Sequence, residues 1–176
     1  MDSIPGYRQS NLLSTAIKTI ILAGLLSGAL DIIAALTDYY ITTGKKPWAV
    51  LKFIASGVFG KKAFSGGGNM IFMGFLFHFI IAFTFTVFFF WLYPKISFLS
   101  KNRIITGILY GIFVWTIMNL VILPLSNTPP LTYTTFKVIK AMLILIVMIG
   151  LPLSFIAHKC LAGYKVNKND SHYPEI

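Results

Sequence analysis

Three polar side chains, Asp31, His78 and Asn119, lie inside long apolar segments of the sequence. A carboxylate beside an imidazole can hold a proton that is exchanged near neutral pH, because an unperturbed histidine titrates between about pH 5 and 8. A charged carboxylate in the middle of a bilayer costs at least about 2.5 kcal/mol, so Asp31 should face other helices and find a hydrogen-bond donor there. His78 is the natural partner, and these residues are the first candidates for chemistry.

The composition shows which solvent surrounds these residues. The 176 residues are 56% hydrophobic and only 11% charged, well below the roughly 25% charged residues of soluble domains. Apolar runs longer than the roughly 18 residues that span hydrocarbon recur along the chain. The sequence therefore predicts an all-α integral membrane bundle and argues against a water-soluble fold.

Four of these runs end at residues that stop a helix or anchor it at a membrane surface. The first ends at Gly44-Lys45-Lys46-Pro47, and the second closes with an aromatic and basic cluster at 91–95. Pro152, near the end of the fourth run, predicts a kink. We expect one membrane domain over residues 1–176, with a disordered tail over 165–176. The four expected spans are residues 17–40, 70–93, 104–125 and 136–158.

A shorter apolar segment, residues 47–60, lies between the first two spans. It is too short to cross a bilayer, and Lys52 interrupts it. Its apolar residues recur at helical spacing, which predicts an amphipathic helix that lies on the membrane surface or re-enters the membrane. The glycine run 66–68 that follows indicates a flexible linker, since a phosphate cradle would need a Walker or dinucleotide motif around it.

Basic residues outnumber acidic ones, with fifteen Lys and Arg against five Asp and Glu and a formal net charge of +10. In a soluble domain this charge would favour nucleic acid. Here the basic residues lie mostly between apolar runs, so anionic lipid headgroups are the expected partners and nucleic acid is not. Eight of them fall on the side of the termini and seven on the other side, which leaves the orientation open. The lysines expected to contact headgroups are Lys45, Lys46, Lys52, Lys61 and Lys62.

Small residues recur every three or four positions in the first three spans, as they do where two membrane helices approach closely. In the first span they share one face with Asp31 and Asp38, and in the second they flank His78 on its face of the helix. The row of small residues in the third span continues towards Asn119. The glycines expected to pack against a neighbouring helix are Gly24, Gly28, Gly74, Gly107 and Gly111.

The three polar residues fall at similar depths when antiparallel spans are counted from the membrane face that they share. At 1.5 Å per residue, Asp31 lies about 10 Å, His78 about 12 Å and Asn119 about 9 Å from that face. The sequence therefore predicts one polar layer in the half of the bilayer facing segment 47–60. Asp31 and His78 should lie within direct or single-water hydrogen-bonding reach.

Three functions are compatible with such a layer. It supports permeation or proton-linked sensing, or it only locks together the helices of a structural or partner-binding subunit, at about 0.6 to 2 kcal/mol per hydrogen bond. In the third, the chain is a membrane enzyme that acts on lipid and gathers anionic headgroups with its basic segment 45–62. A water-filled cavity that reaches Asp31 favours the first function and a dry layer the second. Four short helices enclose little room, so the first function would suit a homo-oligomer.

No catalytic residue, metal ligand set or cofactor is predicted. Cys160 is the single cysteine of the chain, which excludes an intramolecular disulfide and a thiolate metal cage. The sequence also has no HExxH and no GxSxG motif.

Short motifs in the middle of the chain give a resemblance to a known family. They are the His-bearing second span that ends in Tyr93-Pro94-Lys95-Ile96 and the segment from Pro124 to Pro130, together with the Ala23 to Gly28 segment of the first span. This pattern resembles the YagU-like family of small, uncharacterised bacterial inner-membrane proteins, whereas segment 46–68 departs from it. The resemblance implies a multi-pass protein of the bacterial plasma (inner) membrane and supplies no catalytic residues.

Overall fold

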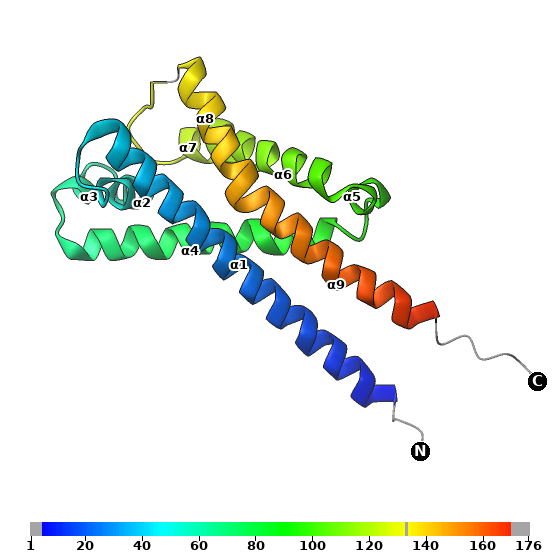
Figure 1. Cartoon of the computed structure of the whole chain (residues 1–176). Coiled ribbons are helices and arrows are strands. Elements are labelled where there is room, and N and C mark those ends of the chain that lie inside the picture. Colours follow the sequence, from blue (N-terminus) through cyan, green and yellow to red (C-terminus); the bar gives the residue numbers. More distant parts are fainter. Residues whose placement is uncertain (1–4, 133, 170–176) are drawn as a thin grey trace, which may run out of the picture.

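The computed structural model is all-helical over the residues that it describes, 5–132 and 134–169, with side chains described for 14–132 and 134–160. The four long helical segments, which we call rods, run antiparallel, so that the chain enters and leaves at the same end of the bundle (Figure 1). In chain order the elements are α1 (Pro5–Thr43), α2 (Ala49–Phe59), α3 (Lys62–Ser65), α4 (Gly68–Leu92), α5 (Ser97–Lys101), α6 (Arg103–Ile117), the π-helical η1 (Met118–Ile122), α7 (Leu123–Leu125), α8 (Thr135–Leu145), the π-helical η2 (Ile146–Gly150) and α9 (Leu151–Asn169).

Within the described residues, four segments are long and apolar enough to cross a membrane, which confirms the expected all-α fold with four spans. The shorter apolar helix α2 lies between the first two of them, where the sequence predicts an amphipathic helix. The chain thus has the architecture of a multi-pass membrane protein. The four segments are Ser14–Thr43, Gly68–Leu92, Arg103–Leu125 and Thr135–Cys160.

The third and fourth rods each contain a π-helical turn just before a proline. The turn η1 precedes Pro124, and η2 precedes Pro152. A proline lacks the N–H that would bond to the carbonyl four residues back, and its ring crowds that carbonyl. A wider π turn makes room for both defects without ending the helix. The irregularity that Pro152 introduces therefore takes the form of this π turn.

The last helix is longer than the sequence suggests. Because α9 continues to Asn169, the expected disorder of residues 165–176 is wrong for 165–169, whose backbone is helical. No proline occurs between Pro152 and Asn169, and lysine and asparagine weaken a helix by less than about 0.7 kcal/mol each. The remainder of the expected tail, 170–176, lies outside the described residues.

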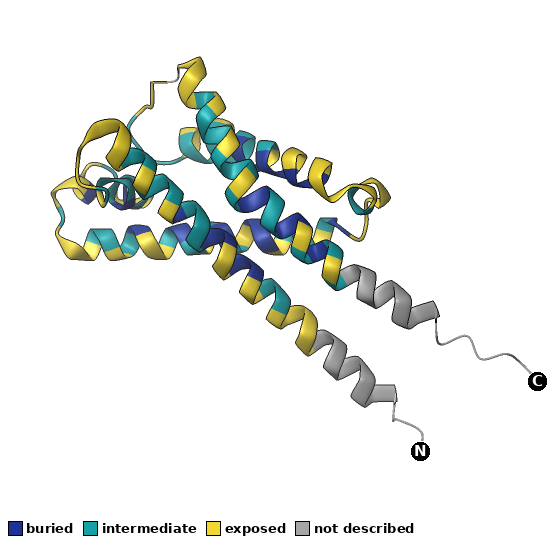
Figure 2. Cartoon of the chain, in the orientation of Figure 1, coloured by how far each residue is buried: buried dark blue, intermediate teal, exposed yellow. Residues whose placement is uncertain are grey.

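The buried core lies in the half of the bundle nearest the chain ends, which we call the packed half. Fully buried Phe89 of α4 contacts the Tyr110 ring of α6, with 4.5 Å between ring centroids. The Tyr110 hydroxyl donates a 2.6 Å hydrogen bond to the carbonyl of Phe85, which joins α6 to α4. Buried positions face inward along α4, α6 and α9 (Figure 2). The core cluster consists of Ala23, Phe85, Phe89, Tyr93, Tyr110, Val114, Ile149, Leu153 and Ala157.

Backbone contact between the third and fourth rods completes the packed half. A Cβ atom at Gly150 would collide with the carbonyl oxygen of Gly107 and lie 3.0 Å from the amide nitrogen of Gly111. Cβ atoms at Gly107 and Gly111 would in turn meet the backbone of α9 and η2. The backbones of the two rods therefore come into direct contact at these glycines, beside the side-chain contacts of the core cluster. Gly107 and Gly111 lie where the sequence indicates close packing, whereas their partner Gly150 was missed.

Candidate functional site

The opposite half of the bundle contains a partly open cavity of ≈ 830 Å³, and we call it the cavity half. This volume falls within the roughly 300–1,000 Å³ of pockets that hold small ligands. Its wall is formed by α1, α2, α4, α6, η1, α7, α8 and η2. Asp31, His78 and Asn119, the expected polar layer, all line this one cavity.

His78 joins α4 to α1 through both of its ring nitrogens. Its Nε2 atom lies 2.8 Å from the carbonyl oxygen of Gly28, and its Nδ1 atom lies 4.0 Å from Oδ2 of Asp31. The second distance suits an ion pair and exceeds a direct hydrogen bond. The His78 and Asp31 side chains are 10% and 18% exposed, so both are largely enclosed and both still reach the cavity.

The hydrogen bond to Gly28 decides which protons the pair can exchange. A carbonyl oxygen only accepts, so Nε2 of His78 must carry a hydrogen and donate it. Nδ1, which faces Asp31, then holds either a lone pair or a second proton. When the pair holds one proton, the first state places it on Asp31 and both groups are neutral, whereas in the second state His78 is a cation opposite a carboxylate. One proton can therefore be shared within the pair without changing its net charge.

Asn119 belongs to the π turn η1, which also lines the cavity. Its Nδ2 atom donates a 2.9 Å hydrogen bond to the carbonyl of Trp115, within the same rod. Trp115 also lines the cavity. The structure thus brings the three predicted residues to one cavity, with Asp31 and His78 as the close pair.

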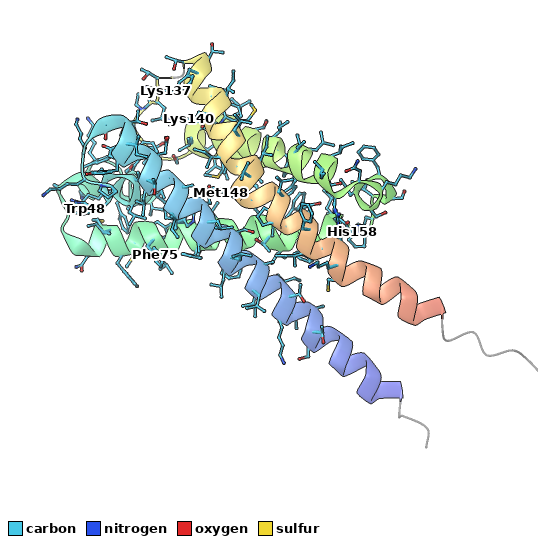
Figure 3. The ribbon with its side chains drawn as sticks, in the orientation of Figure 1. Trp48, Phe75, Lys137, Lys140, Met148 and His158 are labelled. Atoms are coloured by element: carbon cyan, nitrogen blue, oxygen red, sulfur yellow. The ribbon has the colours of Figure 1, made fainter. Side chains whose placement is uncertain are left out.

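A second charge pair lies nearer the end of the cavity, and sequence reasoning did not pair its members. Nζ of Lys140 lies 2.6 Å from Oδ1 of Asp38 and donates a 3.1 Å hydrogen bond to Oγ1 of Thr42. Lys137 and Lys140 stand on the first turns of α8, at the end of the bundle away from the chain ends (Figure 3). One feature of the sequence could have indicated this pair, namely the scarcity of acidic residues. The described residues contain two, Asp31 and Asp38, and both line the cavity.

Helix α2 covers the same end of the cavity. One side of it, including Phe53 and Ile54, lines the cavity. The other side packs on α4 so closely that a Cβ atom at Gly74 would collide with the carbonyl oxygen of Leu51. The loop after α7 holds the far end of α2, since the backbone N–H of Asn127 donates a 3.0 Å hydrogen bond to the carbonyl of Gly57. Gly74 therefore contacts this short helix.

The glycines of α1 lie against α4. A Cβ atom at Gly24 would meet the ring of Phe83, and one at Gly28 would lie 3.0 Å from the ring of Phe79 and 3.2 Å from Cβ of Ala82. These neighbours are side chains, in contrast to the backbone contacts at Gly150. The contact between α1 and α4 can therefore adjust more easily than the backbone contact between Gly150 and α6, because side chains can change rotamer.

The five lysines expected to contact headgroups differ in their surroundings. Lys45, Lys46, Lys61 and Lys62 are exposed. Lys52 is half-buried, and its Nζ atom donates a 3.2 Å hydrogen bond to the carbonyl of Phe64. Lys52 thus joins α2 to α3.

No protein-family model, curated protein or solved structure matches this chain. The geometry of the cavity is therefore the guide to function. Over the part of the chain that the structure describes, no three His, Cys, Asp or Glu side chains group closely enough to hold a metal ion.

Proposed function

We propose that the protein binds and releases a proton at the Asp31–His78 pair and uses this exchange in permeation or in sensing. One observation carries the proposal: both side chains line a cavity of ≈ 830 Å³ in a membrane bundle. Ionisable residues placed in this way are typical of proton and ion pathways. A pair that served only to lock α1 to α4 could be enclosed by apolar side chains as Phe89 is. We further propose a bacterial plasma-membrane location, on the resemblance of segments 93–96 and 124–130 to the YagU-like family.

The surroundings of the pair contain few other groups that could exchange the proton. The helices α2, α6 and α7 and both π turns contribute no ionisable side chain to the described wall. The Asp38–Lys140 pair lies about 10 Å from Asp31 along α1, seven residues away at 1.5 Å per residue, nearer the end of the cavity. The ionisable residues of the wall are Asp31, Asp38, Tyr39, His78, Lys137 and Lys140.

Infrared difference spectroscopy of the purified protein in lipid tests the proposal directly. The chain has five Asp and Glu residues, so few carboxyl bands overlap. We expect a carboxyl band that changes reversibly with pH, because a proton enters and leaves the pair as a unit. Asp31→Asn should remove this change and His78→Gln should shift it along the pH axis. Asp38→Asn, which alters the neighbouring carboxylate, should leave it in place.

Proteoliposomes containing a pH-sensitive dye separate permeation from sensing. Permeation predicts a proton flux that Asp31→Asn abolishes, and sensing predicts the infrared change without flux. If the infrared change is absent, or survives in Asp31→Asn, the pair is an interhelical clamp and the proposed function is wrong.

A further inference from the structure

We infer that the cavity binds a single-chain anionic amphiphile, such as a long-chain fatty acid, with the carboxylate at Lys137 and the hydrocarbon chain inside. The inference concerns the cavity of the proposed function and rests on its being open to a ligand. Its support comes from the charge balance of the wall, the start of α8 and the apolar interior.

When the described charged side chains of the cavity wall are paired, one cationic side chain has no acidic partner among them. Asp31 faces His78, and Asp38 is paired with Lys140. Among the described residues of the wall, Lys137 is the remaining charged side chain, and it is exposed. Both carboxylates already have partners, so a cationic ligand would have to displace one of them. An anion meets Lys137 without breaking either pair.

The backbone at the start of α8 adds to this preference. Lys137 is the third residue of the 11-residue helix α8, and the residue before the helix, Thr134, makes no side-chain cap hydrogen bond. The first N–H groups of a helix lack partners within the helix and carry a partial positive charge. The partial positive charge of this helix end therefore adds to the attraction that the Lys137 ammonium group exerts on a carboxylate.

Beyond this end the cavity suits hydrocarbon. Every wall element except α1 and α8 contributes mainly apolar side chains, and Met118 of η1 can adapt to the shape of a chain. The Asp31–His78 pair carries no net charge while it holds its shared proton, so it does not exclude a chain that passes it. The apolar side chains of the wall include Phe53, Phe77, Ile81, Met118 and Ile144.

Tryptophan fluorescence can report on the cavity alone. The chain has three tryptophans: Trp115 lines the cavity and is 9% exposed, whereas Trp48 and Trp91 are 44% and 55% exposed. In a Trp48→Phe/Trp91→Phe variant, Trp115 is the single indole, and a brominated chain quenches it only on contact. The probes are three brominated amphiphiles of equal chain length with carboxylate, hydroxyl or trimethylammonium heads.

We expect saturable quenching by the brominated fatty acid at a concentration about tenfold lower than for the alcohol, the factor that one charge-assisted contact supplies. Lys137→Gln should raise the half-quenching concentration of the acid by a similar factor and leave that of the alcohol unchanged. The alcohol thus reports whether the cavity of the variant is intact. Lys61→Gln is the matched control, because Lys61 is exposed and does not line the cavity.

Two results would overturn the inference. Acid and alcohol could quench equally with no effect of Lys137→Gln, or the ammonium probe could bind best and depend on Asp31. The infrared measurement needs no ligand, so its failure alone would remove proton exchange and leave Lys137-dependent quenching standing. If quenching does not depend on Lys137 but the infrared change is present, the inferred ligand is wrong and the proposed function still stands.

Discussion

The two halves of the bundle are held together by different kinds of contact. In the packed half, contacts between aromatic rings and glycine backbone join α4, α6 and α9, as at Phe89, Tyr110 and Gly150. In the cavity half, α1 is held by two ion pairs, through Asp31 to α4 and through Asp38 to α8. Closely packed rings and backbone allow little rearrangement, whereas ion pairs can exchange protons and partners. The difference suggests a fixed base and an adaptable cavity within one bundle.

Gly150→Ala should produce the largest effect, because its Cβ would collide with the backbone of α6. Overpacking of this kind costs about 1–3 kcal/mol and occasionally more, so we expect a loss of about 3 kcal/mol in the free energy of unfolding in mixed micelles. Gly57→Ala is the matched control in the cavity half, since its nearest atom lies 3.7 Å away. There we expect a gain of up to about 1 kcal/mol from helix propensity. Equal losses at both positions would remove the distinction between the halves.

Removal of the Asp31–His78 pair should have an intermediate effect. Asp31→Asn and His78→Ala should be non-additive, since either change already removes the interaction between the two side chains. We expect a coupling free energy of about 1 kcal/mol, within the range of interhelical polar contacts in membranes. A double-mutant cycle on the free energy of unfolding measures it at pH 6. Additive losses would show that the two residues act separately.

The Asp38–Lys140 pair should contribute least, because its side chains are 35% and 31% exposed. Exposed pairs contribute about 0.2–1 kcal/mol and are screened by salt. We expect a coupling of about 0.5 kcal/mol between Asp38→Asn and Lys140→Gln that falls as salt increases from 50 mM to 1 M. A larger, salt-independent coupling would place this pair in the fixed part of the bundle instead.

Much of the architecture follows from local properties of the sequence. Apolar runs, and the charged or proline-containing segments that end them, determine the four spans, since a membrane helix must be about 20 apolar residues long. Depth counting brings Asp31, His78 and Asn119 to a common level because helix rise is constant. Small-residue spacing locates the faces of α1 and α6 that meet other helices. Each of these rules uses only positions along one helix or the lengths of successive helices.

The sequence could not determine the contacts between rods, because these depend on which helices face each other across the bundle. The pairing of Asp38 with Lys140 joins the first rod to the fourth, and the contact of Gly150 with Gly107 joins the fourth to the third. The cavity likewise depends on the tertiary arrangement, because its wall combines residues of the four rods with residues of α2. Such contacts join residues far apart in the chain, and their geometry is set by the packing of whole helices, which no local spacing records.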